Sequence, residues 1–244
     1  MRKTAILVIR LLAIICCLVL IAFSSKELLE YNKGKEEARA LRVRVVTPIE
    51  APPKKELPPI SVDFASLAEE NADTVAWLYS KDTPINYPVV QSLDNDYYLR
   101  RGFNGKYNYY GTLFADYRTS GEFSGKNTLI YGHNMKNAEM FGSLINYKEQ
   151  EYFDAHPLLW LFTPEKNYKI TLVAGIEVPG TSELFDALAN PDEAEKVIRD
   201  AIENSTFKLD YTYSEDDRFV TLSTCSYDYA DARYIVIGKL EDFT

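Results

Sequence analysis

The chain is poor in the residues that build disulfides, metal sites and phosphate sites. Of its three cysteines, Cys16 and Cys17 lie in an apolar N-terminal run, so Cys225 is the only thiol in the rest of the chain. A single thiol cannot form an internal disulfide, and with two isolated histidines it does not make a zinc set. The 11 glycines do not cluster into a phosphate-binding loop. The acidic run at 214–217 lacks the ligand spacing of a calcium loop and predicts a solvated turn. We therefore expect no metal and no cofactor.

Positive charge is scarce beyond the N-terminus. Residues 1–47 contain nine Lys and Arg against four Asp and Glu, a net charge of +5, so the remainder must carry −14 for the chain to total −9. A nucleic-acid-binding domain would carry excess positive charge on its folded part, and we therefore expect no nucleic acid partner. Long helical periodicity is also scarce, whereas Tyr and Phe number 18 and 12, which favours a β-rich core.

One long hydrophobic run stands at the N-terminus. From Thr4 to Phe23 the chain is apolar except for Thr4 and Arg10, and 20 helical residues rise about 30 Å, the thickness of a bilayer core. Basic residues at its leading end favour a cytoplasmic N-terminus. We predict a membrane anchor over residues 1–25, with a single-pass topology that places the rest of the chain outside the cell.

Two alternatives to a membrane anchor would also place the rest of the chain outside the cell. A cleaved signal peptide would use Leu11–Phe23 as its apolar region and Ala22-Phe23-Ser24 as the cleavage site. A lipoprotein signal fits less well, because Ile15 before Cys16 is larger than the small residue expected there.

The segment at 26–59 differs in composition from both of its neighbours. Lys26–Val46 predicts a charged juxtamembrane helix that Gly34 interrupts, and five prolines follow between positions 48 and 59. In polyproline geometry those residues form a spacer of roughly 37 Å. Residues 60–244 then remain for one catalytic domain, which is enough to bury a sizeable core.

The sequence of this domain predicts short strands and few helices. Helices are expected at Asp63–Asn71 and at Thr74–Tyr79, capped by Asp63 and Asp73, and at Pro191–Glu203 with Asn190 as its N-cap. Strand-like runs are Ile85–Val90, Thr112–Ala115, Thr128–Tyr131, Leu158–Phe162, Tyr168–Val178, Phe219–Thr224 and Tyr234–Leu240. Seven or eight such strands are typical of a barrel or a sandwich.

Cys225 ends a strand-like run and precedes a polar loop. This position lets a rigid strand present a side chain to a cleft, although a lone cysteine can also be a small buried hydrophobe. A thiol needs a neighbouring base to act as a nucleophile near neutral pH. Of the two histidines, His133 ends another strand-like run, whereas His156 precedes a proline in a polar connection. We therefore predict that His133 is the partner of Cys225.

Arg233 opens the strand that follows the Cys225 loop. A guanidinium at that rim can hold developing oxyanion charge. The alternative is a surface ion pair with Asp228 or Asp231.

The motifs around these three residues resemble those of a known family. Thr-Leu-Ser-Thr-Cys at 221–225, Tyr-Gly-His-Asn at 131–134 and the arginine at 233 are similar to the motifs of the sortases, membrane-anchored cysteine transpeptidases of Gram-positive cell surfaces. The order along the chain, His before Cys before Arg, also agrees with that of the family. Further similar segments, which point to class B sortases, lie at 86–91, 94–99 and 114–118. The resemblance implies a mainly β fold, an eight-stranded barrel with N-terminal helices and an inserted helix between late strands.

The resemblance also implies an activity. Cys225 would attack the carbonyl of a Thr in the C-terminal sorting signal of a surface protein, His133 would protonate the leaving amine, and Arg233 would stabilise the tetrahedral intermediate. An amine of a peptidoglycan precursor, or alternatively a pilin Lys, would then accept the protein. The resemblance assigns a substrate groove to Asn95, Leu99, Leu184, Phe185, Ser223 and Ser226. By composition alone Leu184 and Phe185 are more often core, and Asn95 fits a solvated turn.

Two other classes of protein stay open on the residues alone. An exported cysteine hydrolase would use the same thiol, but papain-like peptidases place Cys before His in the chain. A catalytically silent surface-binding module would leave the combination of Cys225, His133 and Arg233 unexplained.

Overall fold

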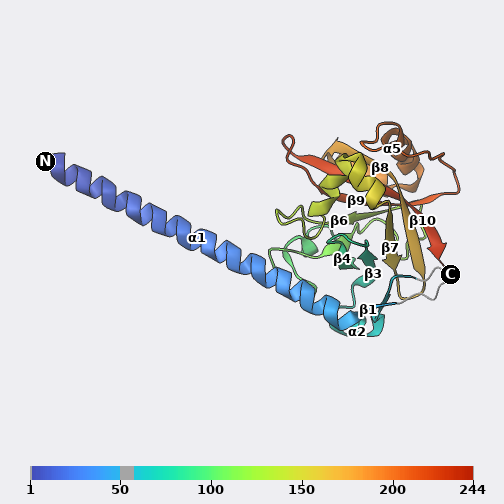
Figure 1. Cartoon of the computed structure of the whole chain (residues 1–244), viewed down its shortest axis with the longest axis horizontal. Helices are drawn as coiled ribbons and strands as arrows, with labels where there is room; N and C mark the ends of the chain where they lie inside the picture. Colours follow the sequence, from blue (N-terminus) through green and yellow to red (C-terminus); the bar gives the residue numbers. More distant parts are fainter. Residues whose placement is uncertain (1, 50–57, 244) are drawn as a thin grey trace.

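An N-terminal helix projects from a β-barrel domain (Figure 1). The computed structural model describes residues 2–49 and 58–243. Helix α1 (Arg2–Val45) is continuous, so the prediction that Gly34 interrupts it is wrong. Gly34 instead marks a close approach of α1 to the domain, because a Cβ atom there would lie 2.4 Å from Asn108 Oδ1. Within the described residues, Leu12–Val45 includes an exposed stretch of mean hydropathy 2.2 that is long enough to cross a membrane.

The described residues on either side of the proline-containing segment pair with each other. Strand β1 (Val46–Pro48) pairs antiparallel with β2 (Ile60–Val62), and the Ile49 amide donates to the Pro59 carbonyl at 3.0 Å. Since both ends of the segment are paired, the expected extended spacer of roughly 37 Å is not what the structure shows. Pro52 and Pro53 lie outside the described residues.

Eight strands close into the predicted barrel. They are β3 (Thr74–Tyr79), β4 (Asn86–Val90), β5 (Leu113–Ala115), β6 (Asn127–Tyr131), β7 (Leu158–Phe162), β8 (Asn167–Pro179), β9 (Arg218–Cys225) and β10 (Ala232–Phe243), in the order β10-β8-β7-β3-β4-β5-β6-β9. Every predicted strand-like run is a strand. The β4–β5 and β6–β9 pairs are parallel, and the others are antiparallel.

The eighth strand is the segment predicted as a second helix. Thr74–Tyr79 forms β3, in which Trp77 and Leu78 are both fully buried, in two different apolar clusters. Successive side chains that are buried on opposite faces suit a strand with both faces covered, and this packing outweighs local propensity. Asp73 is therefore not a helix cap, and its carboxylate accepts a hydrogen bond from the Tyr98 hydroxyl at 2.7 Å.

Helices cover the ends and one side of the barrel. They are α2 (Phe64–Glu70), the 3₁₀ helices η1 (Tyr97–Arg100) and η2 (Gly142–Lys148), α3 (Gln150–Ala155), α4 (Ser182–Ala189) and α5 (Pro191–Glu203). The predicted caps Asp63 and Asn190 accept hydrogen bonds from the first turns of α2 and α5. The α5 helix confirms the predicted insertion between late strands, whereas α4 was not predicted. Residues of both helices share a buried cluster with Ile235 and Ile237 of β10.

The acidic run at 214–217 is more than a solvated turn. Asp217 is 8% exposed, accepts a hydrogen bond from the Tyr211 hydroxyl at 2.6 Å and pairs with Lys239 of β10 at 2.9 Å. The run therefore fixes the entrance to β9 rather than simply facing water.

Candidate active site

The parallel pairing of β6 with β9 brings the predicted histidine and cysteine to one end of the barrel. The last paired residues are Tyr131 and Ser223, and the Gly132 amide donates to the Ser223 carbonyl at 3.1 Å. Two residues further along the chain lie His133, just after β6, and Cys225, the last residue of β9. The Asn134 side chain closes the arrangement by donating to the Cys225 carbonyl at 2.8 Å. The strand ends therefore hold both backbones in place before any side-chain contact is made.

The antiparallel pairing of β9 with β10 places the predicted arginine in the same region. Arg233 lies directly opposite Cys225 in the register, on the strand that follows the 226–231 loop. Its guanidinium is half-buried and pairs with Asp231 at 2.9 Å. Asp228, the other candidate partner, instead pairs with Lys148 of η2 at 2.5 Å. The ion pair that was considered as an alternative role is thus present, but it lies at the rim of the cleft.

A cleft of about 410 Å³ unites most of the predicted residues. Its lining includes Asn95, Leu99, His133, Phe185, Ser223, Cys225 and Arg233. Leu184 and Ser226 are not part of that lining. Leu184 packs against the cluster beneath α4, and Ser226 is 5% exposed, with its amide bonded to the Ala232 carbonyl. The binding roles of all six groove residues stay predictions.

His156 lies far from this cleft. It ends α3, and its ring packs on Tyr152 with the ring centroids 4.6 Å apart. Strand β7 begins two residues later at Leu158, which pairs with Thr171, whereas Arg233 pairs with Val178 of the same β8 strand. Seven strand residues between those positions span about 23 Å. The choice of His133 over His156 therefore agrees with the geometry.

The ring of His133 is held by a backbone carbonyl. Its Nε2 atom lies 2.7 Å from the carbonyl oxygen of Leu99 in η1. Because a carbonyl oxygen only accepts hydrogen bonds, Nε2 must carry the proton. Burial lowers the pKa of His133 below its ordinary value, and nearby Arg100 lowers it further, while the bond to Leu99 acts in the opposite direction. The imidazole is therefore mostly neutral at neutral pH.

This environment predicts a low titration midpoint for His133. In the full-length protein we expect its imidazole to titrate below pH 6.5, the ordinary value for histidine. Histidine-selective ¹⁵N NMR over about pH 4 to 8 measures it, with a His133→Gln variant to assign the signal. Since the unfolded chain binds this proton more readily, His133 should also cost the protein stability as the pH falls through 6.5. A midpoint at or above 6.5 would contradict the burial argument.

A buried carboxylate joins several residues that line the cleft. Asp116 is fully buried and accepts hydrogen bonds from Tyr131 at 2.8 Å, from Asn95 at 3.0 Å and from Arg118 at 2.7 Å. Burial opposes ionisation of Asp116, but these hydrogen bonds outweigh it and hold its pKa below the ordinary value. Arg118 also pairs with Asp186 of α4. Asn95 is thus part of a buried network and not merely of a solvated turn.

Sequence reasoning assigned no site role to Arg118, Tyr131 or Asp186, although all three line the cleft. Phe114-Ala115-Asp116-Tyr117-Arg118 was noted only as a similar segment. The available signal was an acidic and a basic residue two positions apart directly after a short apolar strand. Phe185 fills two roles, because it lines the cleft yet is 9% exposed and its ring lies 5.9 Å from that of Tyr131.

Comparisons with known proteins agree with this site. The family model of the sortase domain matches residues 81–241. The chain is 36% identical over 185 residues to "Sortase B" of Listeria monocytogenes, covering 73% of this chain and 74% of that protein. Its structure is similar to that of sortase B from B. anthracis, with a TM-score of 0.73, 30% identity, and coverage of 88% of this chain and 100% of that one. It is also similar to a Staphylococcus aureus sortase B-substrate complex, with a TM-score of 0.67, 26% identity, and coverage of 74% and 85%.

Proposed function

Because the chain belongs to the class B sortases, within a family of cysteine transpeptidases, we propose that it cleaves the C-terminal sorting signal of surface proteins after a Thr and transfers them to an amine. The observation that supports this most is the register that sets Cys225 opposite Arg233 in a cleft that His133 also lines. The three residues come from the ends of three neighbouring strands, β6, β9 and β10, which is how a rigid scaffold holds catalytic groups in place.

The proposed reaction has two halves. Cys225 attacks the Thr carbonyl as its thiol proton passes to the unprotonated Nδ1 atom of His133, and the carbonyl oxygen takes up negative charge beside the Arg233 guanidinium. The tetrahedral intermediate collapses as the leaving amine takes this proton from the His133 imidazolium, which returns to the neutral ring with its Nε2 proton, and a thioester remains on Cys225. An incoming amine then attacks the thioester and gives a proton to His133, and the new amide leaves as the thiolate is released.

The acceptor that we favour is an amine of a peptidoglycan precursor, so that the reaction anchors proteins to the cell wall. The alternative acceptor is a pilin Lys, which would make the enzyme a pilus polymerase. We further propose that residues 1–25 anchor the enzyme in the cell membrane with the N-terminus cytoplasmic, and that residues 60–244 form the catalytic domain outside. The exposed apolar stretch of α1 supports the anchor.

Mass spectrometry of the enzyme with a sorting-signal peptide tests this function. We expect an acyl adduct on Cys225 that disappears when an amine is added, with formation of the transfer product. Hydrolysis at a rate that is insensitive to amines would instead indicate an exported cysteine hydrolase. The absence of adduct and turnover with every sorting-signal peptide would leave only a binding module.

Replacing Arg233 by lysine separates its two possible roles. If it only forms the rim ion pair with Asp231, Arg233→Lys should behave nearly like the wild type, since such a pair contributes about 0–1 kcal/mol. We expect instead that transfer falls by about 100-fold, because lysine keeps the charge but not the planar pair of donors. Amine-dependent product formation measures the rate, and thermal melting should show almost unchanged stability. A variant that keeps most of its turnover would remove Arg233 from the catalytic set.

A further inference from the structure

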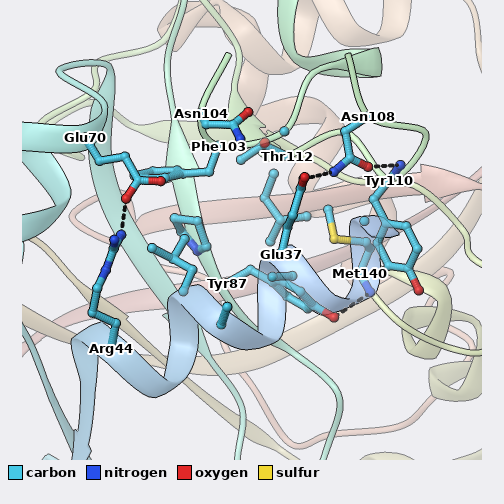
Figure 2. Close-up of a pocket in the computed structure, with 18 residues that line it drawn as sticks. Glu37, Arg44, Glu70, Tyr87, Phe103, Asn104, Asn108, Tyr110, Thr112 and Met140 are labelled. Atoms are coloured by element: carbon cyan, nitrogen blue, oxygen red, sulfur yellow. Dashed lines mark hydrogen bonds and ion pairs between the residues drawn. The ribbon is translucent and has the colours of Figure 1, made fainter. Parts of the chain in front are cut away.

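A second cavity, of about 350 Å³, lies between α1 and the barrel (Figure 2). Gly34, Glu37 and Leu41 of α1 form one wall, and Thr112 lines both this cavity and the cleft that holds Cys225. Helix α1 is therefore separated from the catalytic cleft by a single layer of chain. That layer is the 97–112 segment, which includes Leu99.

The second part of this segment, residues 108–112, supports the backbone around the Leu99 carbonyl. The Asn108 amide donates to the Arg100 carbonyl at 3.0 Å, and the Thr112 amide donates to the Tyr98 carbonyl at 3.2 Å. Gly111 has a positive φ of 63°, and a Cβ atom there would lie 2.7 Å from the Leu99 oxygen. Only glycine fits this close approach, so the carbonyl that accepts from His133 rests directly on the 108–112 backbone.

Helix α1 holds the same backbone through one side chain. Asn108 is 5% exposed, and its side-chain nitrogen Nδ2 donates to the Glu37 carboxylate at 2.6 Å. Its side-chain oxygen Oδ1 accepts from the backbone amide of Tyr110 at 2.9 Å (Figure 2). Asn108 thus bridges Glu37 to the start of the 108–112 turn. A buried amide that loses its carboxylate acceptor must find another partner, and this would shift the turn.

The loop after His133 is tied to α1 as well. Glu139 pairs with Arg42 at 3.4 Å and with Lys35 at 3.6 Å. Asn137 donates to the Tyr110 hydroxyl at 3.0 Å, and the ring of Tyr110 packs on Tyr31 of α1. Helix α1 therefore contacts the supports of His133 on both sides, through Asn108 on one and Glu139 on the other.

We infer that Glu37 is a positioning residue for His133, which acts through Asn108 and the 108–112 turn on the Leu99 carbonyl. This inference rests on the proposed function, in which His133 transfers the proton. It assigns the juxtamembrane helix a part in catalysis that goes beyond tethering the domain.

The charged and titratable groups around His133 come from several elements. They are Arg100 of η1, Arg118 after β5, Tyr131 of β6, Asp186 of α4, Cys225 of β9 and Arg233 of β10. None of them lies on α1. A change at Glu37 should therefore reach His133 through the backbone of the 97–112 segment and not through a direct charge contact.

Glu37→Ala in the full chain, in detergent micelles, tests the inference with two readouts. We expect kcat for transfer to fall by about 10-fold to 100-fold, since a shift of about 1 Å in a catalytic group has effects of this size. Loss of the Leu99 bond also removes an interaction that raises the pKa of His133, so its NMR titration should move to lower pH. A purely structural role would lower the melting temperature and leave the titration in place.

Matched variants isolate the hydrogen bond. Glu37→Gln keeps an acceptor for Asn108 and should retain the wild-type titration. Asn108→Asp sets two carboxylates against each other and should behave like Glu37→Ala, and adding Glu37→Gln should restore both readouts. Arg44→Ala is the control, because it breaks the ion pair with Glu70 at the other end of the same cavity and should change neither kcat nor the titration (Figure 2).

Several outcomes would overturn the inference. One is a Glu37→Ala variant with wild-type kcat and wild-type titration, whatever its melting temperature. If Glu37→Ala does not fold, the comparison of Asn108→Asp with the double variant Asn108→Asp/Glu37→Gln tests the inference. If the double variant does not recover the wild-type kcat and titration, the inference is rejected. An active His133→Ala enzyme would instead reject the proposed function, whereas the NMR titration would still report on the Glu37 contact.

Discussion

A Cys225→Ala variant is expected to form no acyl adduct and to transfer no peptide. Cys225 is the only sulfur nucleophile beyond α1, and no other thiol lines the cleft among the described residues. A methyl group offers no lone pair, so the reaction loses its first step entirely rather than slowing. Intact-protein mass and amine-dependent product formation measure the loss together.

The fold of this variant should be unaffected. Cys225 is only partly buried, and its backbone stays held by Asn134 and by the pairing with β10, so removing one sulfur creates no sizeable cavity. Circular dichroism and thermal melting should match the wild type. Cys16→Ala and Cys17→Ala, both in α1, serve as controls and should keep full activity. Transfer above background by the Cys225→Ala enzyme would remove Cys225 from the role of nucleophile.

The second large effect is expected at the histidines. His133→Ala should lower the transfer rate by about 100-fold to 10,000-fold, the range that general acid–base groups usually supply, because the leaving amine then lacks its proton donor. His156→Ala should stay within a few-fold of the wild type, since that ring packs on Tyr152 near the other end of β8. Single-turnover rates of adduct formation separate this chemical step from substrate binding.

The two histidine variants should also differ in their response to pH. The limb of the rate profile that His133 controls should vanish in His133→Ala and persist in His156→Ala. Equal losses of activity at both positions, or an unchanged profile in the His133 variant, would argue against the pairing of His133 with Cys225.

The sequence predicted the strands well because their signals are local. Seven runs of β-branched and aromatic residues, each bounded by turn residues, all became strands, and the helix at Pro191–Glu203 carries its own cap at Asn190. Thr74–Tyr79 failed because its two faces are buried by residues far away in sequence, which no local window contains. Trp77 shares a cluster with Leu41 of α1 and Trp160 of β7, and Leu78 shares another with Tyr234 of β10. The interruption at Gly34 failed for the same reason, since contact with Asn108 is what requires the glycine.

The residues of the candidate site likewise fall into those that carry a local sequence signal and those that do not. Cys225, His133 and Arg233 were found because each stands at the end of a strand and is scarce or distinctive in the sequence. Only the Asp116–Arg118 pair of the Asp116 network is local. The network was missed because its other members, Tyr131, Asn95 and Asp186, join it from distant positions with no repeated spacing. Leu184 and Phe185 are adjacent, yet only Phe185 lines the cleft, and the facing of neighbours on a short helix cannot be read from composition.

Because α1 is one uninterrupted helix, it fixes both the distance and the orientation of the barrel domain relative to the apolar N-terminal half of the helix. Phe23 and Tyr31 are 8 residues apart, so about 12 Å of helix separates the end of the apolar run from the packing of Tyr31 on Tyr110 of the barrel domain. A flexible tether would let the cleft sweep a wide volume in every orientation. With the membrane anchor proposed above, a stiff arm would confine the cleft to a thin layer, where a substrate held in the same membrane would meet it at a high effective concentration. Under the proposed anchoring, this arm would favour membrane-held peptides over freely diffusing ones without any contact in the cleft that distinguishes them.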